Sequence, residues 1–174
     1  EISTLARQSW WRKDKKAAAD VNLWVHMPIH SWPQDRELYL ELRREACPGV
    51  EDSILLAEAE ELRSKSHGLW NINIFMAGDR PMGVALYDID RDQEEKAGYI
   101  KFLSILPEDR GRGLGVQLIG QAVSMYRNSG WDRLRLHCPA NNDRARRFFE
   151  KYGFKKIGEG PEGDLLEKYI GFEW

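Results

Sequence analysis

Three alternate glycines have the clearest capacity for chemistry in this sequence. They lie in the segment EDRGRGLG, over 108–115, and are Gly111, Gly113 and Gly115. A strand-like run, IKFLSILP, precedes them and a helix-like run, VQLIGQAVSMY, follows. The first N–H groups of a helix have no partner inside the helix, and the helix dipole adds partial positive charge there. Glycines let an anion reach those N–H groups, and Arg110 and Arg112 add charge, so the segment predicts a phosphate-binding turn.

The alternative interpretation is a tight turn with solvated arginines, for which one glycine would suffice. Two well-known phosphate loops are excluded by their spacing. A P-loop needs Lys followed by Ser or Thr after its glycines, and neither pair follows here. The dinucleotide fingerprint G-x-G-x-x-G fails at its last position, where this sequence has Leu118.

Two sequence blocks together resemble the GCN5-related N-acetyltransferase family. The segment Arg110-Gly-Arg-Gly-Leu-Gly115 is similar to its [QR]-x-x-G-x-[GA] motif. The segment NDRARRFFEKYGF, from Asn142 to Phe154, is similar to its N-x-x-A-x-x-[FL]-[YF]-E-[KR]-x-G-F pattern. The blocks occur in the right order, about 30 residues apart. The resemblance covers roughly 22–172 and is strongest over 97–157.

The resemblance implies that acetyl-CoA, or another acyl-CoA, is the acyl donor. Its pyrophosphate would lie on the backbone N–H groups of 110–115, and its pantetheine arm would pair with the strand around Leu103 to Leu106. A strand N–H, that of Ile105, would stabilise the oxyanion. The cofactor-binding residues implied are Leu103, Ile105, Arg110, Gly111, Arg112, Gly113, Leu114, Gly115, Asn142 and Phe149.

The catalytic residues stay open, because the sequence departs from the family pattern where they usually lie. The family's glutamate base corresponds to Tyr99 or Lys101, and its tyrosine acid corresponds to Phe149. A thiol with a pKa near 8.5 can leave as the thiolate without an acid. A base must still deprotonate the attacking amine. The candidates are Tyr99, Glu94 and Tyr152, with Asp88, Asp90, Glu95 and His137 as further groups that are more typical of solvated charges or an ordinary strand histidine.

No metal site is expected. His26 and His30 have the i, i+4 spacing of a helical metal pair, but Pro28 between them breaks the helix that this spacing requires.

Composition limits the class of protein. The chain has 174 residues, 42% of them hydrophobic and 31% charged, with a formal net charge of −2. This charge argues against a nucleic-acid binder, and no apolar run has the roughly 18 residues of a membrane span. Cys47 and Cys138 are expected to be free thiols, which favours the cytoplasm. The sequence begins at Glu1 and not at Met, as expected for a processed product or a piece of a longer protein.

The periodicity of apolar residues predicts a mixed α/β domain over 21–174, preceded by a linker or arm over 1–20. Strands are predicted over 21–29, 69–77, 82–90, 97–106, 132–139, 154–159 and 165–173, and helices over 31–46, 51–65, 112–128 and 141–153. The order is β-α-α-β-β-β-α-β-α-β-β, with 69–90 as a hairpin and the strands of 97–138 parallel. In the family this fold has splayed central parallel strands.

The sequence therefore predicts an acetyl-CoA-dependent N-acetyltransferase that acts on a primary amine by direct attack. The alternative is a weakly catalytic or non-catalytic acyl-CoA-binding module of a larger protein. The acceptor, a small molecule or a peptide, would be selected by 33–65, by the loop from Arg91 to Lys96 and by the last hairpin. A longer acyl donor, a fused N-terminal domain and a homodimer stay open.

Overall fold

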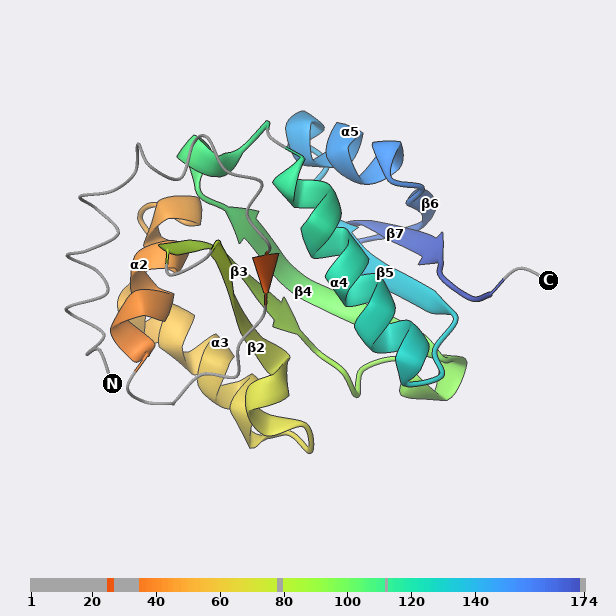
Figure 1. Cartoon of the computed structure of the whole chain (residues 1–174), viewed down its shortest axis with the longest axis horizontal. Coiled ribbons are helices and arrows are strands. Elements are labelled where there is room, and N and C mark those ends of the chain that lie inside the picture. The colour runs from red at the N-terminus through yellow and green to blue at the C-terminus, as the bar shows by residue number, and fades with distance from the viewer. Residues whose placement is uncertain (1–24, 27–34, 78–79, 112, 173–174) are drawn as a thin grey trace. The chain divides into compact units, whose positions relative to one another are not determined.

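The computed structural model describes residues 25–26, 35–77, 80–111 and 113–172. It confirms the predicted order of elements and the mixed α/β class (Figure 1). The strands and helices are β1 (Val25–His26), α2 (Arg36–Ala46), α3 (Asp52–Ser64), β2 (Ile72–Ala77), β3 (Arg80–Tyr87), β4 (Ala97–Ile105), α4 (Leu114–Asn128), β5 (Arg133–Cys138), α5 (Asp143–Lys151), β6 (Lys155–Gly160) and β7 (Gly163–Tyr169). The described residues also form short 3₁₀ helices, namely η2 (Gly68–Asn71), η3 (Gln93–Glu95) and η4 (Pro107–Asp109).

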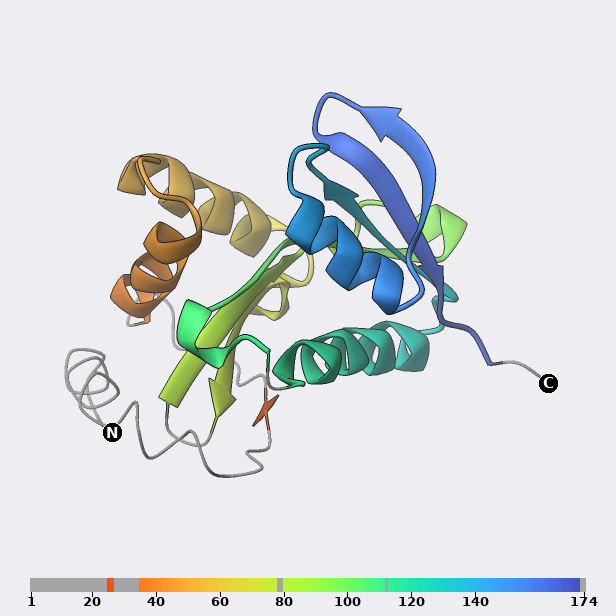
Figure 2. The ribbon, with the colours of Figure 1, turned by 90° about the horizontal axis from the view of Figure 1, so that it is seen from above.

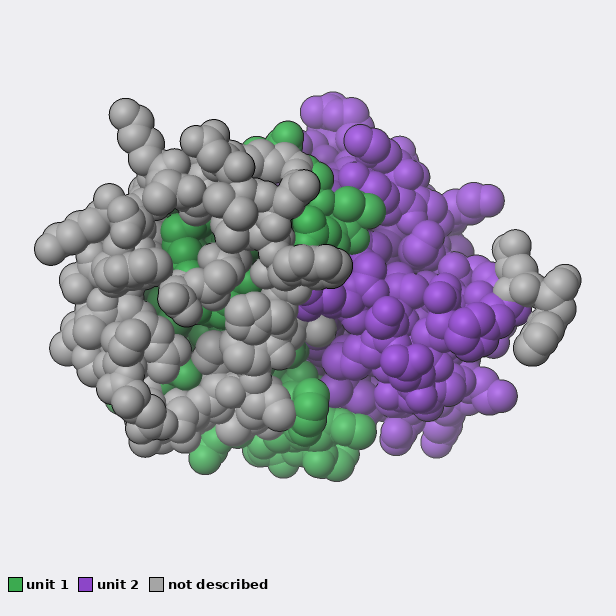
Figure 3. All heavy atoms as spheres, in the orientation of Figure 1, with its two compact units in different colours: residues 1–86, 102–118 green, residues 87–101, 119–174 purple. Residues whose placement is uncertain are grey.

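The chain divides into two compact units (Figure 3). Unit 1 comprises residues 1–86 and 102–118, and unit 2 comprises residues 87–101 and 119–174. Strand β4 and helix α4 each contribute residues to both units. The prediction of a single domain over 21–174 stays a prediction, and the arm over 1–20 lies outside the described residues.

In unit 1 the strands are ordered β1-β2-β3-β4, and β2 and β3 form the predicted antiparallel hairpin. Helix α2 packs on α3, and α3 packs on β2 (Figure 2). Ala46 of α2 is half-buried, but the other apolar residues spaced for one helix face are buried. They are Leu38 and Leu42 of α2 and Leu55, Ala59 and Leu62 of α3, all within one hydrophobic core.

A buried arginine also lies in this core, which the apolar periodicity did not predict. The Arg43 guanidinium is 2.7 Å from a Glu58 carboxylate oxygen and lies 4.0 Å from the centroid of the Phe102 ring. It also donates a hydrogen bond to the Tyr39 hydroxyl, which in turn donates to the Leu55 carbonyl. Burial raises the pKa of Tyr39 to about 12. The ion pair, the stacking and the hydrogen bonds together offset much of the cost of burying this charge.

In unit 2 the strands are ordered β4-β5-β7-β6. The predicted parallel pair is confirmed, and its register runs from Ala97 opposite Arg133 to Ile100 opposite Leu136. Strand β7 is antiparallel to both β5 and β6, so the last two strands form the predicted closing hairpin. The parallel ladder thus ends at Ile100, although β4 continues to Ile105.

Helix α4 closely approaches the sheet of unit 2 at Gly98. The Tyr126 side chain is fully buried, and its hydroxyl donates a hydrogen bond to the Tyr99 carbonyl. Tyr87 and Trp131 meet the Tyr126 ring edge-on, with centroids 5.8 and 5.4 Å away. A Cβ atom on Gly98 would lie 2.5 Å from this ring. Glycine is therefore required at this position by a close approach.

Helix α5 begins two residues after the start of the predicted range 141–153 and ends two residues before its end. The side-chain oxygen of Asn142 accepts a hydrogen bond from the Ala145 N–H, so Asn142 is the N-cap. The helix ends before Gly153, whose φ is 90°. The Lys168 ammonium donates to the Tyr152 carbonyl at this end. Both boundaries are local signals, because each depends on residues within one helical turn.

Replacing Asn142 with alanine should lower the free energy of unfolding by about 1 kcal/mol, because the Ala145 N–H then loses its acceptor. Urea denaturation followed by circular dichroism measures the change. Asn141→Ala is the matched control, since this exposed neighbour does not cap the helix. Equal stabilities for the two variants would contradict the capping role.

Several predicted boundaries were wrong. Leu69 to Asn71 belong to η2 and not to a strand, because Gly68 has a φ of 51° and begins a tight turn. Arg80 and Pro81, predicted in a turn, begin β3, and Asp88 to Asp90 follow that strand. Alternation of apolar residues does not mark the end of a hydrogen-bonded ladder. Ser31 and Pro33, the predicted start of the first helix, lie outside the described residues.

The cysteines and the helices can be compared with what the composition predicted. Cys47 is half-buried and Cys138 is buried, and both are free thiols. Burial raises the pKa of the Cys138 thiol, which makes it less reactive. Within the described part of the chain, no helix combines the length and the apolar character that a membrane crossing requires.

Candidate functional site

The glycine turn of unit 1 adopts a backbone that favours glycine. Gly111 has a φ of 80° and Gly113 has a φ of 75°. Both are exposed, and an added Cβ at either would meet no described atom within 4 Å. The glycines therefore serve the backbone conformation and leave the turn uncovered, which suits an anion that binds N–H groups at the start of α4. Leu114, the first residue of α4, is buried, and Arg112 lies outside the described residues.

Arg110 lies against the end of β4. Its Nε donates a 3.0 Å hydrogen bond to the Ile105 carbonyl, and its backbone N–H donates to the Pro107 carbonyl. The side chain is exposed, so its charge stays next to the turn. The sequence predicted the positive charge of Arg110 at the turn but not the hydrogen bond to Ile105 that positions its side chain.

Strand β4 contains one more residue than β3 along their shared length. The Asp88 N–H donates to the Tyr99 carbonyl, and the Leu106 N–H donates to the Met82 carbonyl. Between these bonds the chain advances by six residues on the β3 side, from Met82 to Asp88, but by seven on the β4 side, from Tyr99 to Leu106. The extra residue is a bulge, which locally disrupts the hydrogen-bonded ladder and bends the strand. Beyond this extra residue, the Ile105 carbonyl accepts a hydrogen bond from the Arg110 side chain.

Leu103 and Ile105, the residues expected beside the pantetheine arm, are half-buried in the part of β4 that belongs to unit 1. Their backbone follows the last parallel pair, at Ile100. The assignment of the pantetheine arm and of the oxyanion to this segment stays a prediction.

The second sequence block forms an aromatic cluster on α5 in unit 2. Phe149 is half-buried, and its ring meets those of Phe154 and Phe148 edge-on at 5.4 and 5.2 Å. The Tyr152 ring lies 5.0 Å from Phe148, at the C-terminal cap of the helix. These contacts explain the apolar residues of this block by packing. Roles for Asn142 and Phe149 in cofactor binding, and for Tyr152 in catalysis, stay predictions.

Tyr99, a candidate from the sequence, is buried in unit 2 and paired with a histidine. Its hydroxyl is 2.5 Å from Nδ1 of His137, and the Arg91 guanidinium lies 4.0 Å from the centroid of its ring. Burial raises the pKa of Tyr99 to about 12. The hydroxyl therefore keeps its proton near neutral pH, so Tyr99 is suited to orient a neighbour and not to act as a base.

His137, one of the further candidates from the sequence, is the histidine that Tyr99 contacts. Its side chain is 15% exposed, and Nδ1 is 3.7 Å from one Glu162 oxygen. The other Glu162 oxygen is 3.7 Å from Arg91. If Nδ1–H faces the Tyr99 oxygen, then Nε2 carries a lone pair that can accept a proton. The Tyr99 oxygen and the Glu162 carboxylate would then stabilise the imidazolium.

The sequence carries part of the information that brings Tyr99 and His137 together. Tyr99 lies opposite Arg135, and His137 is two residues further along β5, so all three side chains share one face. The face could be predicted from alternation alone. The pairing of Tyr99 with His137 needs the register as well.

One acidic candidate, Glu95, pairs with a structural arginine. Arg135 is nearly buried on β5 and forms ion pairs with Asp92, Glu95 and Glu167, at 3.4, 2.9 and 2.8 Å. Hydrogen bonds from Arg135 to Glu167 and Glu95 raise the pKa of the guanidinium, against the opposing effect of its burial. Glu94 is exposed in η3, as expected for a solvated loop charge.

Two other acidic residues follow β3. Asp88 is buried, and Asp90 is half-buried. Among the described residues, no group of three or more His, Cys, Asp or Glu side chains could hold a metal ion. The side chain of His26, and all of His30, lie outside the described residues.

Known proteins share this fold. A protein of Pyrococcus horikoshii OT3 has a TM-score of 0.69 and 16% identity, over 84% of this chain and 98% of that one. The PaiA N-acetyltransferase from Thermoplasma acidophilum, in complex with coenzyme A, has a TM-score of 0.64 and 19% identity, over 84% of this chain and 99% of that one. At these identities the likeness shows the fold.

Curated relatives match over shorter segments. N-alpha-acetyltransferase 50 of Danio rerio is 29% identical over 80 residues, which are 45% of this chain and 48% of the relative. Mycothiol acetyltransferase of Beutenbergia cavernae is 38% identical over 60 residues, which are 34% of this chain and 20% of the relative. The chain therefore spans about half or less of the length of these curated relatives. The model of the family described as "Acetyltransferase (GNAT) family" matches residues 29–154, so the chain belongs to the GNAT acetyltransferase family.

Proposed function

We propose that this protein is an acetyl-CoA-dependent N-acetyltransferase that transfers the acetyl group directly to a primary amine. The observation that carries the proposal is the uncovered glycine turn at the start of α4, within the segment that matches the family. The space that a Cβ would fill at Gly111 and Gly113 suits a pyrophosphate on the backbone. The structural relative in complex with coenzyme A supports the same class of donor.

The reaction forms a C–N bond between the amine and the thioester carbonyl carbon, and the C–S bond breaks. A free alkylamine has a pKa near ~10 and must lose a proton to react, so a base is needed. In this proposal Nε2 of His137 accepts that proton. Tyr99 fixes the imidazole ring, and Glu162 provides the counter-charge for the imidazolium. The CoA thiolate leaves without an acid, which agrees with phenylalanine at position 149.

A glutamate in place of Gly113 should reduce the affinity for acetyl-CoA by about tenfold or more. A non-glycine residue is strained at a φ of 75°, and a carboxylate would repel the pyrophosphate. Isothermal titration calorimetry with acetyl-CoA measures the loss.

The matched control for this change is Gly130→Glu. Gly130 also has a positive φ, 92°, and an added Cβ there would meet no described atom within 4 Å. It follows α4 and does not precede it, so the control should bind acetyl-CoA like the unaltered chain. Equal affinities for Gly113→Glu and the unaltered chain would show that the phosphate assignment is wrong.

Turnover separates the enzyme from a binding module. Purified protein is mixed with acetyl-CoA and a panel of amines, and the released thiol is followed with a thiol reagent. The panel should include peptides with free N-termini, because N-alpha-acetyltransferases are among the relatives. Acetyl-CoA binding without turnover of any amine would favour a non-catalytic acyl-CoA-binding module.

Two free thiols support a reducing compartment such as the cytoplasm.

A further inference from the structure

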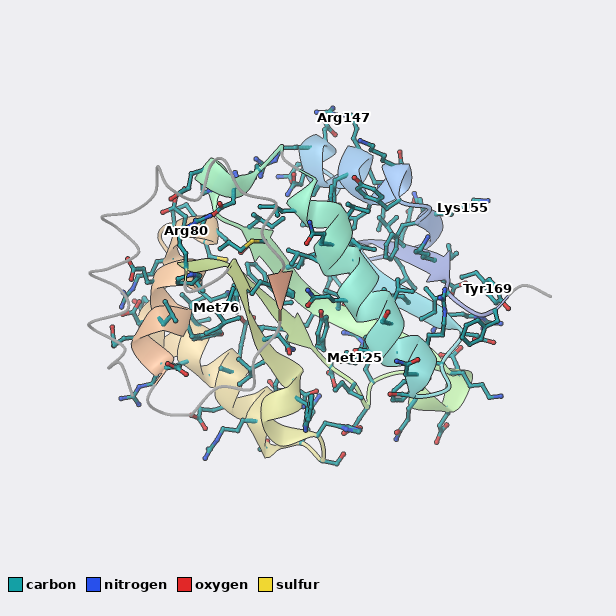
Figure 4. All side chains as sticks on the ribbon, in the orientation of Figure 1. Met76, Arg80, Met125, Arg147, Lys155 and Tyr169 are labelled. Atoms are coloured by element: carbon teal, nitrogen blue, oxygen red, sulfur yellow. The ribbon has the colours of Figure 1, made fainter. Side chains whose placement is uncertain are left out.

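A buried ion pair lies directly before the glycine turn in unit 1. Arg80 is the first residue of β3, and Asp109 is the last residue of η4 (Figure 4 labels Arg80). The guanidinium donates to both carboxylate oxygens, with Nη1 at 2.8 Å from Oδ2. The Arg80 side chain is 5% exposed and that of Asp109 is fully buried. This buried pair therefore lies directly before the exposed residues of the turn, which begin at Arg110.

The backbone ties the same segment to β3 at a second point. The Leu106 N–H donates to the Met82 carbonyl at 2.7 Å, and the Asp109 N–H donates to the Leu106 carbonyl at 2.9 Å. The strands approach so closely here that a Cβ on Gly83 would overlap the Ser104 carbonyl oxygen. One backbone bond and one side-chain pair, two residues apart on β3, thus fix both the position and the direction of η4.

Stability alone is a poor explanation for this pair. Taking two charges out of water is costly, and apolar replacements of buried ion pairs often fold as well as the original. What a bidentate arginine–carboxylate pair adds is a fixed relative orientation of the two groups. Arg80 also neutralises a carboxylate that would otherwise repel an anion bound to the next few residues.

We propose that Arg80 and Asp109 are positioning residues for the phosphate turn. Their pairing holds η4 so that the backbone after Asp109 presents its N–H groups in the geometry that the pyrophosphate requires. This inference rests on the proposed use of an acyl-CoA donor. It predicts that loosening the pair weakens the recognition of the pyrophosphate specifically, and that restoring stability by other means does not restore that recognition.

Two variants and two donors test the proposal. Arg80→Lys keeps the charge but loses the two-pronged geometry, and the double variant Arg80→Met with Asp109→Leu replaces the pair by apolar side chains. Each variant is titrated with CoA, and kcat/KM is measured with acetyl-CoA and with S-acetyl-pantetheine, which has no pyrophosphate. Thermal denaturation reports the folding of each variant. Arg44→Lys is the matched control, because Arg44 forms a similar pair with Asp52 that is exposed on the surface.

The expected result is a loss of CoA affinity of about tenfold or more in Arg80→Lys and in the double variant, with Arg44→Lys unchanged. The kcat/KM for S-acetyl-pantetheine should stay the same in all variants. The double variant should melt near the unaltered chain and yet bind CoA weakly.

Three results would overturn the inference. CoA affinity could be unchanged in both variants, or it could recover fully in the double variant together with the melting temperature. Alternatively, kcat/KM could fall equally for acetyl-CoA and S-acetyl-pantetheine, which would indicate general damage to the fold. Absence of CoA binding by the unaltered chain would instead overturn the proposed function, and this inference with it.

Discussion

Replacing His137 with glutamine is expected to lower kcat about a hundredfold or more, with little change in the affinity for acetyl-CoA. Glutamine is similar in size and can still form a hydrogen bond with the Tyr99 hydroxyl, but it cannot accept a proton from the amine. The change therefore removes the base while the local packing is kept. Steady-state turnover with the best acceptor, together with calorimetry for acetyl-CoA, measures the two effects separately.

Tyr99→Phe serves as the graded comparison for His137→Gln. The imidazole would lose the hydroxyl that orients Nδ1, so kcat should fall by about tenfold, less than for the loss of the base itself. His67→Gln is the matched control, since His67 lies in the turn before η2. If His137→Gln retains full kcat while Glu94 or Tyr152 substitutions abolish it, the base is one of those residues.

Replacing Gly98 with alanine is expected to lower the free energy of unfolding by about 3 kcal/mol. The new Cβ would lie 2.5 Å from the Tyr126 ring, which cannot easily move. That ring is fully buried, its hydroxyl bonds to the Tyr99 carbonyl, and two aromatic neighbours meet it edge-on. The clash must therefore shift α4 or the β4 backbone, both of which cost stability. Urea denaturation of the purified variant measures the change.

Gly158→Ala is the matched control for this overpacking. Gly158 also lies within a strand, β6, but the atom nearest to a Cβ added there would be 3.9 Å away, which is an ordinary contact. Its replacement should change the free energy of unfolding by less than about 1 kcal/mol. Equal stability losses in the two variants would show that a general intolerance of the strands to alanine, and not the approach of Tyr126, explains the effect.

Features that depend on neighbours in sequence were predictable. Asn142 and Gly153 mark the two ends of α5, because capping and a positive φ each depend on a single turn of the chain. The glycine turn at 111–113 was predicted for the same reason, and the structure gives both glycines positive φ values. The order of strands and helices followed from apolar periodicity, which each segment carries by itself. The family followed from two such local blocks.

Features that join distant segments could not be predicted from the sequence. The Tyr99 hydroxyl meets His137 across 38 residues, and Arg80 meets Asp109 across 29. Alternation predicts which face a strand residue occupies, but a shift of one residue in register would place it on the other face. The extra residue on the β4 side shifts the register in this way, and no residue type between Tyr99 and Leu106 indicates where it lies.

The glycine turn, the helix caps and the family could thus be recognised before folding was considered, because residues a few positions apart specify each of them. The choice of His137 over Tyr99 as the proposed proton acceptor depends on packing, because only packing shows that Tyr99 is buried with a pKa of about 12. The buried ionic anchor of the turn depends on packing too, since Arg80 reaches Asp109 only once β3 and β4 are aligned.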